Sequence, residues 1–471
     1  MPSLTGRLVQ SIEAVGDTVS EAFFEPVVRL GVTGLSRAGK TVFITALVQN
    51  LMEPGRMQRM RAVQAGHIQG VWLQPQPDMT LPRFDYESHL AALTGDAPRW
   101  PDGTRAVSEL RLSFRLAPTG LLAGLTGLGG PRKLHLDIVD YPGEWLLDLG
   151  LMGKSYADWS AELLARLPSR DQAGPFLALL DGTDPQRAHD ESVAQDLARS
   201  FTAYLTEARA AGWSDCSPGR FLLPGDLAGS PVLTFAPLPG AEGRRGSLWR
   251  EMARRFDGYK AQVVRPFFEA HFARIDRQVV LIDVLEAVHQ GPAALEDQRR
   301  AMAEVLQAFR PGANGFFSSL LRGRRVEKIL FAATKADHLH HTQHPRLTAL
   351  VEAMLREARD RARFSGAETA ALSLAALRAT VEETRDYSGR AVDVVRGRLM
   401  DGRQAAVNAG ELPEDPARLL APARDGAGRW LQGDYGVMHF APPVLNRIPG
   451  QGLPHIRLDA AAEFLIGDKL V

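Results

Sequence analysis

The chain has 471 residues, of which 45% are hydrophobic and 23% are charged, as in ordinary globular proteins, so extensive disorder is excluded. Lys and Arg together number 55, as do Asp and Glu, so the formal net charge is zero and general nucleic-acid binding is not expected. Cys216 is the only cysteine, which excludes an intrachain disulfide and a cysteine-based zinc site. No apolar run reaches the roughly 20 residues that a membrane span requires.

The first half of the chain alternates between strand and helix patterns. An amphipathic pattern at residues 4–15 predicts a helix packed on the body, with a membrane-surface helix as the alternative. A strand is predicted at 25–34 and a helix from Lys40 to about Met52, followed by an irregular stretch at 53–105. Strands at 106–118 and 133–143 flank a glycine-rich loop, which indicates a hairpin.

The second half begins with a mostly helical region at 144–212, in which the apolar run 175–182 fits either a short strand or a helical turn. A helical pattern covers 247–275, and Pro266 is expected to kink it. The later predicted elements are strands within 278–288, 327–337 and 368–380, a helix at 293–309, a hairpin at 394–408 and a final helix at 458–470.

The segment GLSRAGKT matches the phosphate-binding pattern G-x-x-x-x-G-K-[ST], known as the P-loop, and lies between a strand and a helix. In this pattern the backbone N–H groups of the loop and the N-terminus of the next helix bind phosphates. Lys40 is expected to contact the β- and γ-phosphates, and the Thr41 hydroxyl to bind Mg²⁺. The residues of this loop expected to contact nucleotide are Gly34, Ser36, Arg37, Ala38, Gly39, Lys40, Thr41 and Val42.

A second motif, D-x-x-G, follows at the end of the strand predicted at 133–143. Asp140 is expected to hold Mg²⁺ through water, and the N–H group of Gly143 to face the γ-phosphate. Thr104, just before the strand at 106–118, is a further candidate for sensing the metal and the γ-phosphate. A purely structural loop threonine is the alternative.

A third motif, Thr334-Lys335-Ala336-Asp337, matches [NT]-K-x-D at the end of another strand. The Asp337 carboxylate can accept hydrogen bonds from both N1–H and N2–H₂ of guanine, a donor pair that adenine lacks. Lys335 is expected to lie over the base, and the segment Ala375-Ala376-Leu377 to donate a backbone N–H to the guanine O6. The motif therefore predicts GTP and GDP as ligands rather than ATP.

These elements occur in the order that Ras-like GTPases use. The segments VTGLSRAGKTVFITALV, DYPGEWLLDL, FAATKADH and LPHIRLDAAAEFLIGDKL more closely resemble the YcjX-like family of bacterial P-loop GTPases. The resemblance implies a stress-inducible protein with a Ras-like core, bound Mg²⁺ and slow GTP hydrolysis. It also implies a cytoplasmic location in a bacterium, leaves peripheral contact with the inner membrane open, and indicates no particular pathway.

Two residues depart from the Ras pattern. Glu144 follows the D-x-x-G glycine where Ras-like enzymes have glutamine, and it is expected either to orient the attacking water or to point away. Arg37 occupies the loop position at which guanylate-binding proteins carry an internal arginine finger, and an exposed or salt-bridged arginine is the equal alternative. With Lys40 and Thr104, these two residues make up the predicted catalytic set.

The fold class expected from these elements is α/β, a P-loop NTPase three-layer core with a mostly parallel sheet. The core is predicted at 28–150 and 274–390, with a mainly helical insertion at 151–273 and a C-terminal hairpin and helix at 391–471. The expected function is that of a slow, switch-like GTPase with an unknown protein partner. The alternatives are a GTPase activated by GTP-dependent dimerisation at membranes and a nucleotide-dependent interaction protein with negligible hydrolysis.

Overall fold

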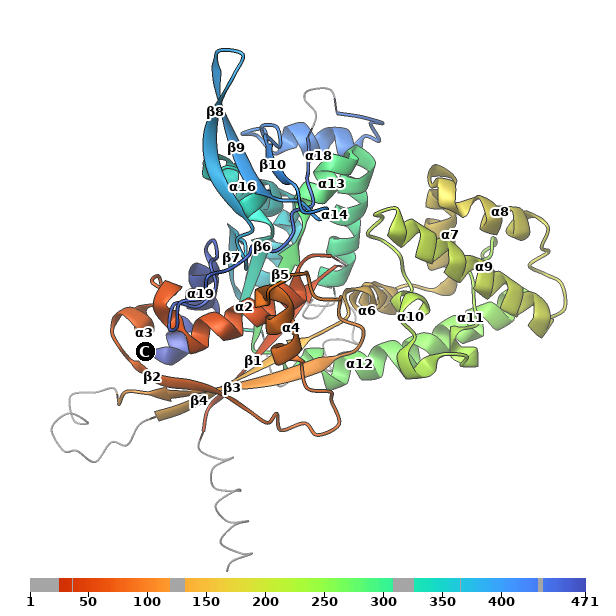
Figure 1. The fold of residues 1–471 in the computed structure, drawn as a ribbon. Coiled ribbons are helices and arrows are strands. Elements are labelled where there is room, and N and C mark those ends of the chain that lie inside the picture. The colour runs from red at the N-terminus through yellow and green to blue at the C-terminus, as the bar shows by residue number, and fades with distance from the viewer. Residues whose placement is uncertain (1–24, 36, 119–131, 308–325, 365, 431–434) are drawn as a thin grey trace, which may run out of the picture.

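The computed structural model describes residues 25–35, 37–118, 132–307, 326–364, 366–430 and 435–471. A seven-stranded sheet with the order β2-β3-β4-β1-β5-β6-β7 lies at its centre (Figure 1). The strands are β1 Val27–Gly34, β2 Ile68–Gln74, β3 Ser108–Leu116, β4 Arg132–Asp140, β5 Arg277–Ile282, β6 Lys328–Ala333 and β7 Glu368–Ser373. The neighbouring strands β4, β1, β5, β6 and β7 are parallel, whereas β3 pairs antiparallel with both β2 and β4.

Helices cover both faces of this sheet. Both faces of its parallel strands are therefore buried, and the sequences of these strands are largely apolar. Alternate residues of β5 point to opposite layers: Val280 and Ile282 belong to one apolar cluster, and Val279 and Leu281 to the other. The helices are α2 Lys40–Met52, α4 Tyr86–Thr94 and α19 Leu458–Leu470 on one side, and α13 Val284–Gln290, α14 Pro292–Gln307 and α16 His344–Met354 on the other. The predicted three-layer α/β fold with a mostly parallel sheet is confirmed.

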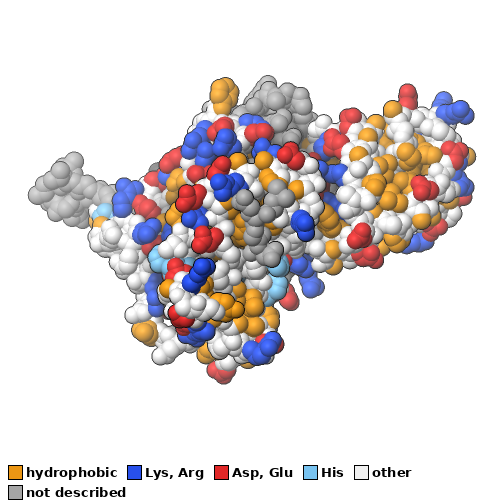
Figure 2. Space-filling model, turned by 90° about the horizontal axis from the view of Figure 1, so that it is seen from above, with side chains coloured by type: hydrophobic (Ala, Val, Ile, Leu, Met, Phe, Trp, Pro, Cys, Tyr) orange, Lys and Arg blue, Asp and Glu red, His pale blue; other side chains and the backbone are white. Residues whose placement is uncertain are grey.

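Between β4 and β5 the chain forms a lobe of helices beside the sheet (Figure 1), and Figure 2 shows this lobe projecting to one side with apolar, acidic and basic side chains intermixed. Aromatic rings fill its interior, where Trp159 stacks on Phe256 with 4.9 Å between ring centroids and meets Phe235 edge-on at 5.7 Å. The longer helices of the lobe are α7 Tyr156–Arg166, α8 Gly174–Asp181, α9 Glu191–Ala210, α11 Leu248–Tyr259 and α12 Arg265–Ala270.

A separate three-stranded antiparallel sheet follows β7 and projects away from the core (Figure 1). Its strands are β8 Thr380–Tyr387, β9 Arg390–Arg398 and β10 Gln404–Val407. The pairing of β9 with β10 confirms the hairpin predicted at 394–408. Strand β8 was not expected, because its sequence TVEETRDY is polar on both faces and shows no apolar alternation.

Several predicted elements differ in the structure. Residues 53–105 are not irregular throughout, since they contain the edge strand β2 and the helix α4, and β2 is held by its register with β3 in spite of an irregularity between Ile68 and Gly70. The run 175–182 lies in the helix α8 and not in a strand. Strand β5 ends at Ile282, earlier than the predicted 278–288, because the Asp283 side chain accepts a hydrogen bond from the Glu286 N–H and caps α13.

The predicted long helix at 247–275 is interrupted by a π-helical turn, Lys260–Val264, directly before Pro266. The final helix is confirmed at Leu458–Leu470. The amphipathic pattern at 4–15 and the glycine-rich loop before β4 lie outside the described residues, and the proposed domain limits at 150, 273 and 390 stay predictions. No described helix is long and apolar enough to cross a membrane.

The core packing generates a stability prediction at β6. Phe331 is 1% exposed and belongs to the apolar cluster between the sheet and α16. We expect Phe331→Ala to lower the free energy of unfolding by about 3–5 kcal/mol, because the change removes buried surface and leaves a cavity. Phe364→Ala is the matched control, since that side chain is 95% exposed and its loss should cost about 0.5 kcal/mol or less. Equal urea midpoints for the two variants would contradict this packing.

Candidate functional site

The sequence motifs meet at the carboxyl ends of the parallel strands. Register places Val32 of β1 opposite Asp140 of β4, and Gly34 opposite Leu281 of β5. On the other side, Ile282 of β5 lies opposite Ala333, the last residue of β6. The P-loop, the D-x-x-G segment and the T-K-x-D segment therefore share one edge of the sheet, which is where ligands bind in open α/β sheets.

The P-loop turns from β1 into α2 through Gly39, which has a φ of 86° and lies in the left-handed region that favours glycine. The Lys40 amine donates to the carbonyl oxygen of Gly34 at 2.9 Å and lies 3.4 Å from that of Leu35. Burial lowers the pKa of Lys40, while the nearby carboxylates, including that of Asp140, act in the opposite direction. Ser36 lies outside the described residues.

Three oxygen-bearing side chains gather beside this lysine. The Thr104 hydroxyl donates to Oδ2 of Asp140 at 2.6 Å and lies 3.5 Å from the Thr41 hydroxyl oxygen. The other carboxylate oxygen of Asp140, Oδ1, is buried and has no hydrogen-bond partner among the described residues. Burial raises the pKa of Asp140 to about 6, although the Lys40 charge opposes the shift. This donor set fits Mg²⁺, which prefers oxygen ligands.

The chain after Asp140 packs directly on the P-loop. Gly143 begins the helix α6, Gly143–Leu147, and a Cβ atom there would lie 2.5 Å from the Gly34 carbonyl oxygen and 2.9 Å from the Lys40 amine. Only glycine therefore permits this approach of the start of α6 to the loop. The arrangement brings the Gly143 backbone to the lysine that is expected to contact the γ-phosphate.

Two arginines line a pocket next to these residues. Arg209, near the end of α9 in the helical lobe, forms an ion pair with the buried Glu144 carboxylate. Arg37 is exposed, and within the described part of the chain its guanidinium has no hydrogen-bond or ion-pair partner. Glu144 is thus turned toward the lobe, and Arg37 is left beside the P-loop.

The T-K-x-D segment is held by two neighbouring segments. The Asp337 carboxylate accepts a hydrogen bond from the Ala379 N–H at 2.7 Å, and the Asp337 carbonyl accepts one from the Thr380 hydroxyl. Lys335 has a φ of 57° and forms an ion pair with Asp283 at the end of β5. Burial lowers the pKa of Lys335, but the nearby carboxylates, of which Asp283 contributes most, together have the larger effect, so the pKa of Lys335 is raised overall. Thr334, at the start of the segment, is buried.

The segment expected to contact guanine O6 follows β7. The N–H of Ala375 donates to the Ile456 carbonyl at 3.1 Å, so this group is engaged by the strand-like segment before α19. Ala376 and Leu377 lie at the bend that follows, and their N–H groups donate to no acceptor among the described residues. These two residues, rather than Ala375, have backbone donors available.

The helical lobe is joined to the D-x-x-G segment by buried polar contacts. Asp148 accepts hydrogen bonds from the Tyr259 hydroxyl at 2.5 Å and from the Gly219 N–H at 2.7 Å. Gly219 begins the short helix α10, Gly219–Leu222, where a Cβ atom would meet the Glu144 carbonyl oxygen at 1.9 Å. The Trp145 indole N–H donates to the Leu223 carbonyl at 3.0 Å. The lobe therefore contacts the segment directly after Gly143.

Two site residues were not anticipated from the sequence. Asp283 directly follows a buried strand, so its position at the carboxyl end of β5 was a signal that could have identified it. Arg209 lies in the last turn of the amphipathic helix α9, more than 60 residues from Glu144, and no local feature distinguishes it from the other arginines.

The buried Asp148 generates a pH prediction. Burial raises its pKa from 3.8 to about 6. The protonated, buried carboxyl group of Asp148 therefore favours the folded state. This contribution to stability is fully present below the pKa that Asp148 has in the unfolded chain, and it is lost as the pH rises through about 6. We expect Asp148→Asn, which cannot ionise, to gain stability relative to the wild type between pH 4 and pH 7, by on the order of 2–3 kcal/mol. Urea unfolding at both pH values measures this difference, and a pH-independent gap would refute it.

Comparisons with known proteins identify the family of this chain. The profile of the YcjX-like family, DUF463, matches residues 28–470. A protein named Ras-like GTPase YcjX from Escherichia coli K12 is 39% identical over 462 residues, covering 94% of this chain and 96% of that protein. A protein of the same name from Shewanella oneidensis MR-1 is 34% identical over 469 residues, covering 94% of each. The chain therefore belongs to the YcjX-like family.

Proposed function

We propose that this chain binds GTP and GDP and hydrolyses GTP to GDP and phosphate as a slow, switch-like GTPase. The observation that carries the proposal is that the Lys40 amine donates to the Gly34 carbonyl at the end of β1, at the point where Gly143, just after β4, packs on the P-loop. This arrangement is what a γ-phosphate site requires, since a cation and a backbone N–H meet at one point. The name of the two relatives, Ras-like GTPase, supports the same activity.

The phosphate side of the site would use the P-loop backbone and the Lys40 amine to bind the β- and γ-phosphates. Thr41, Thr104 and Asp140 would hold Mg²⁺, directly or through water. When bound, the ion neutralises charge on the phosphate oxygens. Because Asp140 Oδ1 is buried without a partner among the described residues, a cation here would satisfy a carboxylate oxygen that protein groups leave unpaired.

The base side would use Asp337 to select guanine. The Ala379 N–H fixes one oxygen of this carboxylate, which leaves the group oriented by the backbone rather than free to rotate. Lys335 would lie along the base with its amine held by Asp283. The N–H groups of Ala376 and Leu377 are the candidates for the contact with guanine O6.

Catalysis would depend on charge stabilisation rather than on a covalent intermediate. Arg37 would neutralise charge near the β–γ bridge, and its exposure within the P-loop without a partner among the described residues supports this role. The Glu144 carboxylate is engaged by Arg209, so it would orient water only after this ion pair opens. The ion pair supports a low intrinsic rate. A role in bacterial stress response and a cytoplasmic location are further proposals that rest on the family resemblance.

Base selectivity is the direct test of the proposal. In Asp337→Asn, we expect the amide oxygen to accept from Ala379, so that the amide NH₂ group faces the base. Guanine would then lose an acceptor for its two donors, whereas xanthine, which carries O2 as an acceptor, would gain a partner.

Calorimetry should show wild-type binding of GTP and GDP without comparable ATP binding. The variant should lose GDP affinity by about tenfold or more and prefer xanthosine diphosphate. Recovery of binding with the xanthine nucleotide also shows that the variant is folded. Equal wild-type affinities for ATP and GTP would remove the basis of the proposal.

The arginine of the P-loop gives a second prediction. If Arg37 acts in the transition state, Arg37→Ala should lower kcat by about tenfold or more while GTP affinity changes little. Arg37→Lys should recover only part of the rate, because lysine keeps the charge but not the planar pair of donors. Binding of GDP with aluminium fluoride, which mimics the transferring group, should weaken more than binding of GDP alone.

Arg245→Ala is the matched control, since this arginine is also exposed but lies in the helical lobe outside the pocket. Its turnover and its affinity for the aluminium fluoride complex should equal those of the wild type. Wild-type turnover in Arg37→Ala would exclude an arginine finger at this position.

A further inference from the structure

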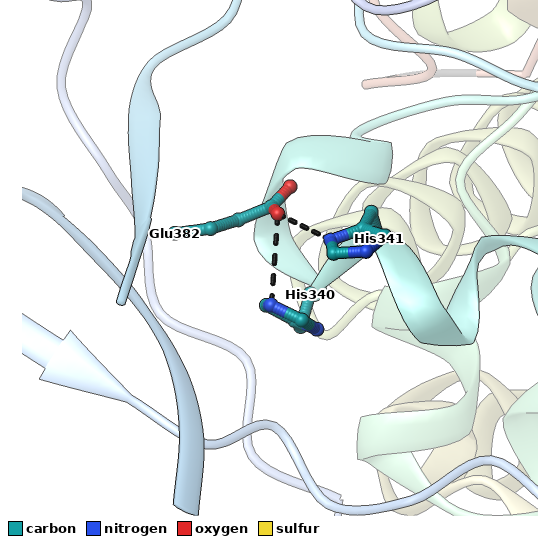
Figure 3. Close-up of side chains that lie close together, drawn as sticks. All are labelled: His340, His341 and Glu382. Carbon is teal, nitrogen blue, oxygen red and sulfur yellow. Dashed lines mark hydrogen bonds and ion pairs between the residues drawn. The ribbon is translucent and has the colours of Figure 1, made fainter. Parts of the chain in front are cut away.

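A cluster of two histidines and a glutamate lies outside the nucleotide-binding residues. His340 and His341 are adjacent in the chain just after the T-K-x-D segment, and Glu382 comes from β8. The three side chains offer ligand atoms that all lie within 4.8 Å of one another. Figure 3 shows both imidazole rings turned toward the same carboxylate.

Small movements of these side chains would bring them to the spacing that one bound ion requires. The Glu382 Oε2 atom lies 2.6 Å from Nδ1 of His341 and 3.6 Å from Nε2 of His340. A tetrahedral ion bound at about 2.0–2.1 Å holds its ligand atoms about 3.3 Å apart. The His340 pair is already close to this spacing, whereas the hydrogen-bonded His341 pair would have to widen by about 0.7 Å. The His341 side chain is 65% exposed, so its ring can adjust and the open side of the cluster is accessible to water.

Neighbouring groups orient two of these ligands. The Nδ1 atom of His340 lies 3.4 Å from a carboxylate oxygen of Asp393 on β9 and 3.0 Å from the Thr342 hydroxyl oxygen, which leaves its Nε2 atom toward Glu382. The Oε1 atom of Glu382 lies 3.5 Å from the Arg378 guanidinium, which leaves Oε2 toward the histidines. Partners of this kind, on the far side of each ligand, are typical of metal sites in proteins.

We propose that His340, His341 and Glu382 form a binding site for a divalent transition-metal ion, and that Zn²⁺ suits these donors best. Imidazole nitrogen favours zinc, nickel and copper over Mg²⁺ or Ca²⁺, which take oxygen ligands. Two histidines and one carboxylate supply three protein ligands, and water would complete the coordination. This site is distinct from the oxygen-rich cluster at Asp140.

The ion would join two segments that hold the guanine-selective aspartate. Asp337 lies in the turn Ala336–His338, just before His340 in the chain. Ala379 and Thr380, which bond to Asp337, lie where β8 begins, on the same strand as Glu382. A metal bridge between the turn and β8 would therefore restrain the position of Asp337. The inference goes beyond GTP hydrolysis, because metal binding can be measured on the protein without nucleotide.

The test is Zn²⁺ binding by the full chain, freed of any tag histidines and measured at pH 7.5 by calorimetry and by competition with a chromogenic chelator. We expect one Zn²⁺ per chain, bound in the presence of excess Mg²⁺. His341→Ala and Glu382→Gln should each weaken Zn²⁺ binding about tenfold or more, since each removes one of three protein ligands. Because the His341 side chain is exposed, we expect His341→Ala to fold like the wild type, and melting curves without metal check this.

Two control variants keep the result specific. Glu383→Gln changes the next residue of β8, whose side chain pairs with Arg396 on the opposite face of the strand. His67→Ala removes a histidine just before β2, at the other edge of the main sheet. Both should bind Zn²⁺ like the wild type. Absence of Zn²⁺ binding by the wild type, or equal binding by all variants, would show that the cluster is only a set of ion-paired side chains and would overturn the proposal.

Discussion

The close approach of the segment after β4 to the P-loop is the constraint on which the candidate site depends. A glycine at 143 lets the chain pass within contact distance of the Gly34 carbonyl and the Lys40 amine, where any side chain would collide with backbone. Parallel pairing of β1 with β4 places Val32 opposite Asp140, so the two strands end side by side and their following segments start close together. The buried lysine, the metal-binding oxygens and the start of α6 are therefore placed by one backbone contact.

The same segment links the site to the helical lobe. Glu144 pairs with Arg209 and its carbonyl lies against Gly219, while Asp148 is buried under the Tyr259 hydroxyl. Buried polar groups of this kind are costly to leave unpaired, so the lobe and the segment after Gly143 must keep compatible positions. Any displacement of that segment would have to be accommodated by the lobe, and this coupling follows from packing alone.

The charges of the site balance over short distances in a chain with no net charge. Lys40 faces Asp140, Lys335 faces Asp283, and Arg209 faces Glu144, so each buried charge has a nearby opposite one. Arg37 is the exception among the cations of the candidate site, because it is exposed and has no partner among the described residues. A polyphosphate would supply the missing negative charge at the point where the P-loop presents its backbone donors.

The sequence by itself determined the α/β class, the strand–loop–helix of the P-loop and the three strand-end motifs, because these depend on local apolar patterns and on residue types at fixed spacing. Strands β2 and β8, the partner of Glu144 and the engagement of Ala375 by Ile456 were decided only by the tertiary structure. Strands β2 and β8 show little apolar periodicity because few of their side chains are fully buried, and each is positioned by pairing with a neighbouring strand. Contacts between residues far apart in the chain have no local signature, since they exist only once separate elements pack together.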